Sequence, residues 1–125
     1  MLKSVLLVDD NAVVRRALCE AFASEADFEV CGEADNGRGA IEKARALHPD
    51  LIVMDLSMPT MNGIDATRAL KVLMPMVPVI LFTMYSDAFS EQEAESAGAS
   101  ALISKSGPVS VLIAKARVLL CPAAA

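Results

Sequence analysis

Four short and mainly apolar runs of the sequence each end beside a side chain that could do chemistry. The runs are residues 5–8, 51–54, 79–82 and 101–104, and the side chains that follow them are Asp9 with Asp10, Asp55, Thr83 and Lys105. Apolar runs of this length predict strands that are buried inside a parallel sheet. Ligands bind at the carboxyl ends of the strands in such a sheet, so we expect these side chains to converge on one site.

The chemistry of this set of side chains is that of a metal-assisted phosphoryl site. Three carboxylates at one point repel one another unless a proton or a cation neutralises them. Ligation by oxygen alone suits Mg²⁺, which keeps several of its waters and is usually completed by a phosphate oxygen. Lys105 supplies a positive charge and Thr83 a hydroxyl donor for the other phosphoryl oxygens. The set therefore predicts phosphoryl transfer onto Asp55 as the nucleophile.

Each of these residues taken alone has a plainer interpretation. An aspartate after a strand is usually a helix cap or a turn former, Lys105 would be a solvated charge, and Thr83 a strand residue. Their joint placement with Asp55 favours the functional interpretation. His48, the only histidine, precedes Pro49 without partner ligands, so we expect a loop residue there.

Strand and helix patterns alternate five times along the chain, and this order fixes the expected fold class. The fold is α/β: a single doubly wound five-stranded parallel sheet with helices on both faces. The flavodoxin-like order 2-1-3-4-5 fits best, because it places the polar second strand, residues 28–34, at an edge of the sheet. Helix caps are predicted at Asn11 and Asn62.

Two of the helices carry expectations about which side chains are buried. The helix after Asn11 is expected to leave Arg15 outside the apolar stripe that packs on the sheet. The helix predicted for residues 86–97 has few apolar side chains to bury, namely Ala88, Phe89, Ala94 and Ala97. We expect it to be the loosest helix of the fold.

Length, composition and charge limit the classes of function. The 125 residues predict one domain, 1–125, with a core of about residues 3–120 and a tail at 121–125. A formal net charge of −5 without a basic run argues against direct binding of nucleic acid or of an anionic membrane surface. Cysteine usage, the lack of an apolar span of about 20 residues and the lack of a signal peptide predict a soluble protein of the cytoplasm.

Over essentially its whole length the sequence resembles the receiver domain of bacterial two-component response regulators. The resemblance rests on Asp9-Asp10, on Asp55-Leu56-Ser57-Met58-Pro59 with Gly63, on Thr83, and on Ala97-Gly98-Ala99 before Lys105. Gly32-Glu33-Ala34 with Asn36-Gly37, and Tyr85-Ser86-Asp87, are similar to the branch that has LuxR-type helix-turn-helix outputs. We expect no output domain of this kind within residues 1–125.

The resemblance implies a phosphoacceptor signalling domain. Asp55 would accept a phosphoryl group from a histidine kinase or a phosphotransfer protein, and the domain would switch conformation to control an output domain or partner outside this chain. The implied ligands of Mg²⁺ are Asp10, Asp55 and the Ser57 backbone carbonyl, with Asp9 acting through a water. Lys105 would contact the acyl phosphate and Thr83 would sense it. Such a domain would have no enzymatic activity beyond promoting its own phosphorylation and dephosphorylation. A homodimer is also compatible with the resemblance.

Three departures from the family pattern bear on switching and gating. Leu102 stands where many members have an aromatic switch residue, Ser106 where many have proline, and Met84 where many have a small residue. The gating positions are Thr83, Met84, Tyr85 and Leu102. Because Leu102 cannot hydrogen-bond as a tyrosine would, we expect the switch to be read through Thr83, the loop at Tyr85 and the loose helix, rather than through residue 102.

Alternatives from other classes are weaker. A phosphatase of the haloacid dehalogenase type needs a second acid two residues after the nucleophile, where this chain has Ser57. A flavodoxin-like flavin carrier needs a loop rich in serine and threonine after the first strand, where this chain has Asp9-Asp10-Asn11. The nearest alternative is a receiver-like interaction module that is not phosphorylated.

Overall fold

Strands and helices alternate throughout the part of the chain that the computed structural model describes, residues 2–58, 60–84 and 87–120. In chain order the elements are β1 (Lys3–Val8), α1 (Ala12–Ala23), β2 (Phe28–Ala34), α2 (Gly37–Leu47), β3 (Leu51–Asp55), α3 (Gly63–Leu73), β4 (Val79–Thr83), α4 (Ala88–Ala97), β5 (Ala101–Ser104) and α5 (Val109–Leu120). All neighbouring strands are parallel and their order is β2-β1-β3-β4-β5, so the predicted fold class and strand order are confirmed.

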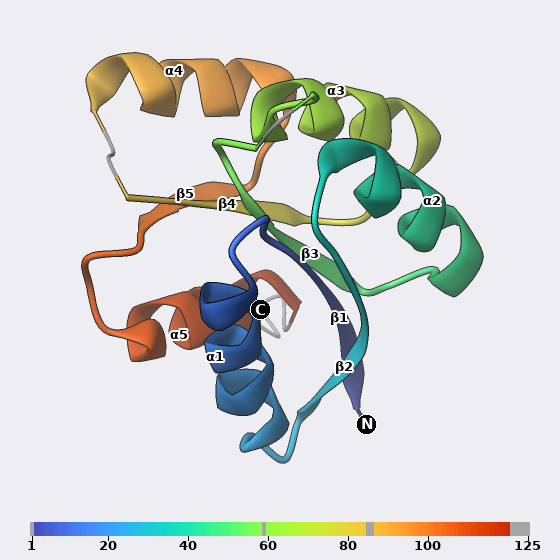
Figure 1. Ribbon diagram of the computed structural model, residues 1–125, viewed down its shortest axis with the longest axis vertical. Coiled ribbons are helices and arrows are strands. Elements are labelled where there is room, and N and C mark those ends of the chain that lie inside the picture. The colour runs from blue at the N-terminus through green and yellow to red at the C-terminus, as the bar shows by residue number, and fades with distance from the viewer. Residues whose placement is uncertain (1, 59, 85–86, 121–125) are drawn as a thin grey trace.

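The helices cover both faces of the sheet, with α1 and α5 on one face and α2, α3 and α4 on the other (Figure 1). Side chains of the central strand β3 alternate between the two apolar clusters under these helices. Ile52 and Met54 pack on the side of α2, α3 and α4, whereas Leu51 and Val53 pack on the side of α1 and α5. Because both faces are covered, every residue of β3 is buried, including Asp55 at its end.

The second strand lies at an edge of the sheet, as its polar composition predicted. Its pairing with β1 shifts register after Val5, which pairs with Val30, because the next pair is Leu6 with Gly32. Cys31 is the extra residue at this irregularity. The part of β2 beyond it returns to regular pairing and runs beside the end of β1, next to the predicted site.

Helix caps place the first turns of four helices directly after the loops that follow strands. The side chains of Asn11, Asn36, Asn62 and Asp87 each accept a hydrogen bond from a backbone N–H of the first turn. The predicted caps at Asn11 and Asn62 are confirmed. Each cap fixes where its helix begins, so the loop between strand and helix has a defined length.

Helix α4 packs on the rest of the fold through little apolar surface. Ala94 and Ala97 are buried, but Phe89 is 69% exposed, so its predicted burial was wrong. At helical spacing the face that contains both alanines also contains Ser90 and Glu93, and Phe89 lies off this face. The side chain of residue 88 lies outside the described part of the chain. No helix in the described residues is long and apolar enough to cross a membrane.

Candidate functional site

The three predicted acids meet at the carboxyl end of the sheet. Asp9, Asp10 and Asp55 each offer a carboxylate oxygen, and these oxygens all lie within 4.8 Å of one another. Asp9 and Asp10 follow β1, and Asp55 ends the neighbouring strand β3, in which Met54 pairs with Val8. Parallel strands bring their carboxyl ends together, so the convergence follows directly from the strand order. Asp9 and Asp55 are buried, whereas Asp10 is exposed.

Lys105 reaches this cluster from the loop after β5. Its ammonium group donates a hydrogen bond of 2.8 Å to Asp9 Oδ2 and lies 3.3 Å from Asp55 Oδ1. Its backbone N–H donates to the carbonyl of Thr83, which ties the loop to the end of β4. The Lys105 side chain is only 10% exposed, so its charge acts in a region of low dielectric constant.

The electrostatics of the site show an excess of buried negative charge. Burial, followed by the charge of Asp9, raises the pKa of Asp55 to about 6, although Lys105 and the Ser57 N–H act in the opposite direction. Burial alone would lower the pKa of Lys105, but its hydrogen bond to Asp9 and the charges of both aspartates outweigh burial and raise it. A single ammonium group therefore does not balance these carboxylates, and a bound cation would lower the free energy of the ionised site.

The donor set fits Mg²⁺. The three side chains offer only carboxylate oxygens, and one of them, Asp10, is open to solvent, as an ion that keeps several waters requires. Asp9 is already engaged on both oxygens: Oδ1 accepts from the N–H of Asn11 at 2.8 Å and Oδ2 accepts from Lys105. Ser57 lies two residues after Asp55, and its N–H donates to Asp55 Oδ1 at 3.3 Å.

Gly63 allows the start of α3 to lie against the backbone at the end of β3. A Cβ atom on Gly63 would stand 2.4 Å from the carbonyl oxygen of Asp55 and 2.9 Å from the Cα atom of Leu56. The Gly63 N–H donates a 2.7 Å hydrogen bond to the Leu56 carbonyl. Only glycine fits this approach without displacing backbone, which explains why glycine follows the Asp55-Leu56-Ser57-Met58-Pro59 segment at position 63.

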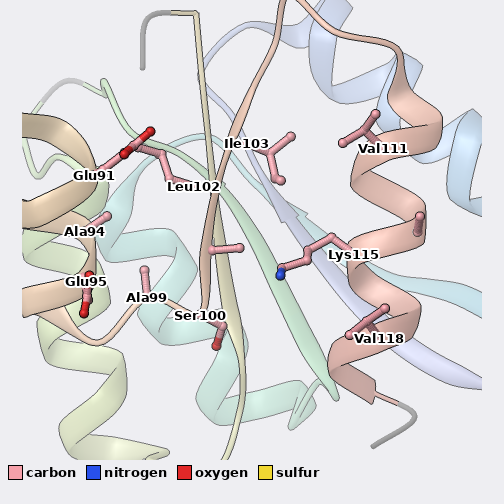
Figure 2. A pocket seen from close by; sticks show the side chains of 12 residues that line it. Glu91, Ala94, Glu95, Ala99, Ser100, Leu102, Ile103, Val111, Lys115 and Val118 are labelled. Atoms are coloured by element: carbon pink, nitrogen blue, oxygen red, sulfur yellow. The ribbon is translucent and has the colours of Figure 1, made fainter. Parts of the chain in front are cut away.

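The predicted gating residues occupy different surroundings. Thr83 ends β4 and is buried, and Met84 directly after it is 57% exposed. Tyr85 lies outside the described residues. Figure 2 shows Leu102 on the α4 side of β5 and Ile103 on the α5 side, both lining a groove of about 790 Å³ between these helices. Leu102 also packs on the cluster under α2, α3 and α4.

Among the described residues, Arg15 contacts the site although the sequence patterns did not predict it. Arg15 was expected outside the apolar stripe of α1, yet its side chain is only 21% exposed and folds back toward the loop before the helix. One guanidinium nitrogen, Nη1, donates a hydrogen bond to the backbone carbonyl of Asp9. The helical period alone carries no signal for this contact, because it assigns a residue to a face and not to a loop carbonyl.

Comparison with known proteins identifies the family. The family model of the response regulator receiver domain matches residues 5–117. This chain belongs to the response regulator receiver family. One relative is the chemotaxis protein CheY of Thermotoga maritima, which is 42% identical over 103 residues that cover 82% of this chain and 85% of that protein. Another is a protein-glutamate methylesterase/protein-glutamine glutaminase of Nocardioides sp., 40% identical over 81% of this chain and 28% of that protein.

Solved structures agree with this assignment. The structure of a two-component response regulator of the LuxR family from Aurantimonas sp. matches with a TM-score of 0.93 at 29% identity, over 98% of this chain and 87% of that one. The predicted likeness to the LuxR branch is thus confirmed. This receiver spans about a quarter of the length of the methylesterase relatives that it matches. Receivers are phosphoacceptor signalling domains of two-component systems, and the comparisons do not favour the alternative of an unphosphorylated module.

Proposed function

We propose that Asp55 is the phosphoacceptor of this receiver and takes a phosphoryl group from a histidine kinase or a phosphotransfer protein. The observation that carries the proposal is the convergence of three acids within 4.8 Å on a lysine that lies 3.3 Å from Asp55 Oδ1. In the transfer, an Asp55 oxygen forms a bond to phosphorus while the bond from phosphorus to the donor nitrogen breaks. The product is an acyl phosphate on Asp55.

The residues around Asp55 would each have a separate role in metal binding or in contact with the phosphoryl group. Asp10, Asp55 and the Ser57 backbone carbonyl would hold Mg²⁺, which neutralises charge on the phosphoryl oxygens when it is bound. Asp9 would act through a water, which agrees with the two hydrogen bonds that already engage its oxygens. Lys105 would turn from the aspartates to the acyl phosphate.

Switching would begin at Thr83, whose hydroxyl would bind the phosphoryl group, and would continue into α4. The small apolar contact of α4 supports this proposal, because a helix that buries little surface has low local stability. Met84, Tyr85 and Leu102 are the proposed gating positions beside this path. Output domains or partner proteins outside the chain would read the change.

The extent of the domain, its cellular location and its activity are proposed from the same family membership. We propose one receiver domain over residues 1–125 with its core at about 3–120, acting in the cytoplasm with no activity beyond its own phosphorylation and dephosphorylation. The net charge of −5 supports the absence of direct nucleic-acid or membrane binding. A homodimer is compatible with this assignment. The tail predicted at 121–125 lies outside the described residues.

The acceptor is tested by intact mass after incubation with acetyl phosphate and Mg²⁺. We expect the wild-type protein to gain one phosphoryl group that hydroxylamine removes, and we expect no gain for Asp55→Ala or in the presence of EDTA. The matched control is Asp65→Ala, which removes an exposed aspartate of α3 that pairs with Arg68. Labelling of Asp55→Ala at the wild-type level would refute the acceptor, and labelling undiminished by EDTA would refute the role of the metal.

A further inference from the structure

Arg15 joins the loop of the acidic site to two other elements of the fold. It lies in the first turns of α1, and its Nη1 donates a 2.6 Å hydrogen bond to the carbonyl oxygen of Asp9. Its Nε donates at 2.9 Å to Oε1 of Glu33, which projects from β2. One planar guanidinium group therefore connects α1, β2 and the loop between β1 and α1, using two donors in fixed relative geometry.

The carbonyl of Asp9 controls the direction in which Asp10 leaves the chain. The carbonyl of residue 9 and the N–H of residue 10 belong to one planar peptide group, so a hydrogen bond to the carbonyl fixes the orientation of the whole group. The other polar groups of Asp9 are held as well, since its N–H donates to Ala34 and its carboxylate accepts from Asn11 and Lys105. Asp10 is exposed, so its side chain depends on the backbone for its position.

We propose that Arg15, held in place by Glu33, is a positioning residue for the metal site of this receiver. The inference rests on the proposed function, because it assumes that Asp10 and Asp55 bind Mg²⁺. Arg15 fixes the peptide group between Asp9 and Asp10, and this keeps the Asp10 carboxylate close to Asp55 before the ion arrives. Groups that orient metal ligands in this way typically contribute about 10-fold or more to metal affinity.

The direction in which Mg²⁺ affinity changes when Arg15 is replaced distinguishes a positioning role from a purely electrostatic one. Arg15 carries a positive charge beside an acidic cluster, so its removal would strengthen Mg²⁺ binding if only long-range electrostatics mattered. Positioning predicts the opposite, because a free peptide group lets Asp10 move away from Asp55. A structural role limited to the pairing of α1 with β2 predicts lower stability with unchanged metal affinity.

The experiment is a Mg²⁺ titration of the complete chain without any phosphodonor, followed by the amide resonances of Asn11 and Ser57. These amides donate to Asp9 and Asp55, so they report on both sides of the site. The variants are Arg15→Met and the charge exchange Arg15→Glu with Glu33→Arg. The exchange keeps an ion pair between α1 and β2 but removes the donor that reaches the Asp9 carbonyl.

The matched control is Arg117→Met. Arg117 also joins a helix to the β2 region, since its Nε donates at 2.8 Å to Asp27, but Asp27 lies before β2, at the other end of the strand from the acids. We expect Arg117→Met to reduce stability and leave Mg²⁺ affinity within about 2-fold of wild type.

Each outcome decides between the explanations. Mg²⁺ binding weakened about 10-fold in both Arg15 variants, with native amide spectra, supports positioning. The positioning role is overturned if Arg15→Met binds Mg²⁺ as tightly as wild type or more tightly, or if the charge exchange has wild-type Mg²⁺ affinity. Because the exchange retains the ion pair, it keeps the inference testable even if Arg15→Met does not fold. Lack of Mg²⁺ binding by the wild-type protein would overturn the proposed metal role together with this inference.

Discussion

Replacement of Gly63 by alanine is expected to damage both the fold and the proposed acceptor site. The new Cβ would lie 2.4 Å from the Asp55 carbonyl oxygen, where 3.4 Å is the start of ordinary contact, so the backbone must retreat by about 1 Å. The two nearest atoms, the Asp55 carbonyl oxygen and the Leu56 Cα atom, are main chain and cannot rotate away. Overpacking of this kind costs about 1–3 kcal/mol in the free energy of unfolding.

The same displacement should also slow phosphorylation, because the atom that must move belongs to Asp55 itself. A misplacement of about 1 Å at a reacting group can lower a rate by about 100-fold. We therefore expect Gly63→Ala to be labelled by acetyl phosphate between about 10-fold and 100-fold more slowly than wild type. The assays are urea denaturation for the free energy of unfolding and the time course of intact mass for labelling.

Gly39→Ala is the matched control for Gly63→Ala. Both glycines lie in the first turn of a helix, but a Cβ on Gly39 would meet the Ala34 Cβ and the Asn36 Oδ1 no closer than 3.4 Å. Alanine in place of glycine inside a helix stabilises it by up to about 1 kcal/mol, so Gly39→Ala should be neutral or more stable and be labelled normally. Wild-type stability and wild-type labelling of Gly63→Ala would refute the argument from close approach.

Three further predictions concern switching, gating and pH. Binding of beryllofluoride should shift amide resonances from Thr83 to Ala99, because α4 buries little apolar surface; shifts confined to the metal site would contradict this. Met84→Ala should speed both labelling by acetyl phosphate and dephosphorylation several-fold, about 1 kcal/mol in each barrier, and an unchanged phosphoprotein half-life would exclude a gate at this position. The hydrogen bond from Arg117 lowers the pKa of Asp27, so this pair stabilises the fold above about pH 4 and loses its effect as pH falls through the folded pKa. The difference in urea stability between wild type and Asp27→Asn should therefore shrink in acid, and a difference independent of pH would argue against the pair.

The sheet and the acids were predictable because both depend on short-range patterns and one topological rule. The short length of a run such as residues 51–54, and the turn residues on both sides of it, favour a buried strand, and a parallel order then brings Asp9 and Asp55 to the same edge. Phe89 was misplaced because α4 has too few apolar residues to define the phase of its buried face. Arg15 was missed for another reason: a long side chain on a polar face can fold back to a loop carbonyl, and no periodicity encodes that contact.

The two outer strands of the sheet also determine how copies of this receiver can meet. An unprotected edge invites strands of other chains to continue the sheet, which leads to aggregation. Here β5 has only four residues, and β2 combines a register shift at Cys31 with the exposed carboxylates of Glu29 and Glu33. Such edges discourage strand addition. Any self-association of this receiver is therefore expected to use the outer surfaces of its helices and to add no strand to the five-stranded sheet.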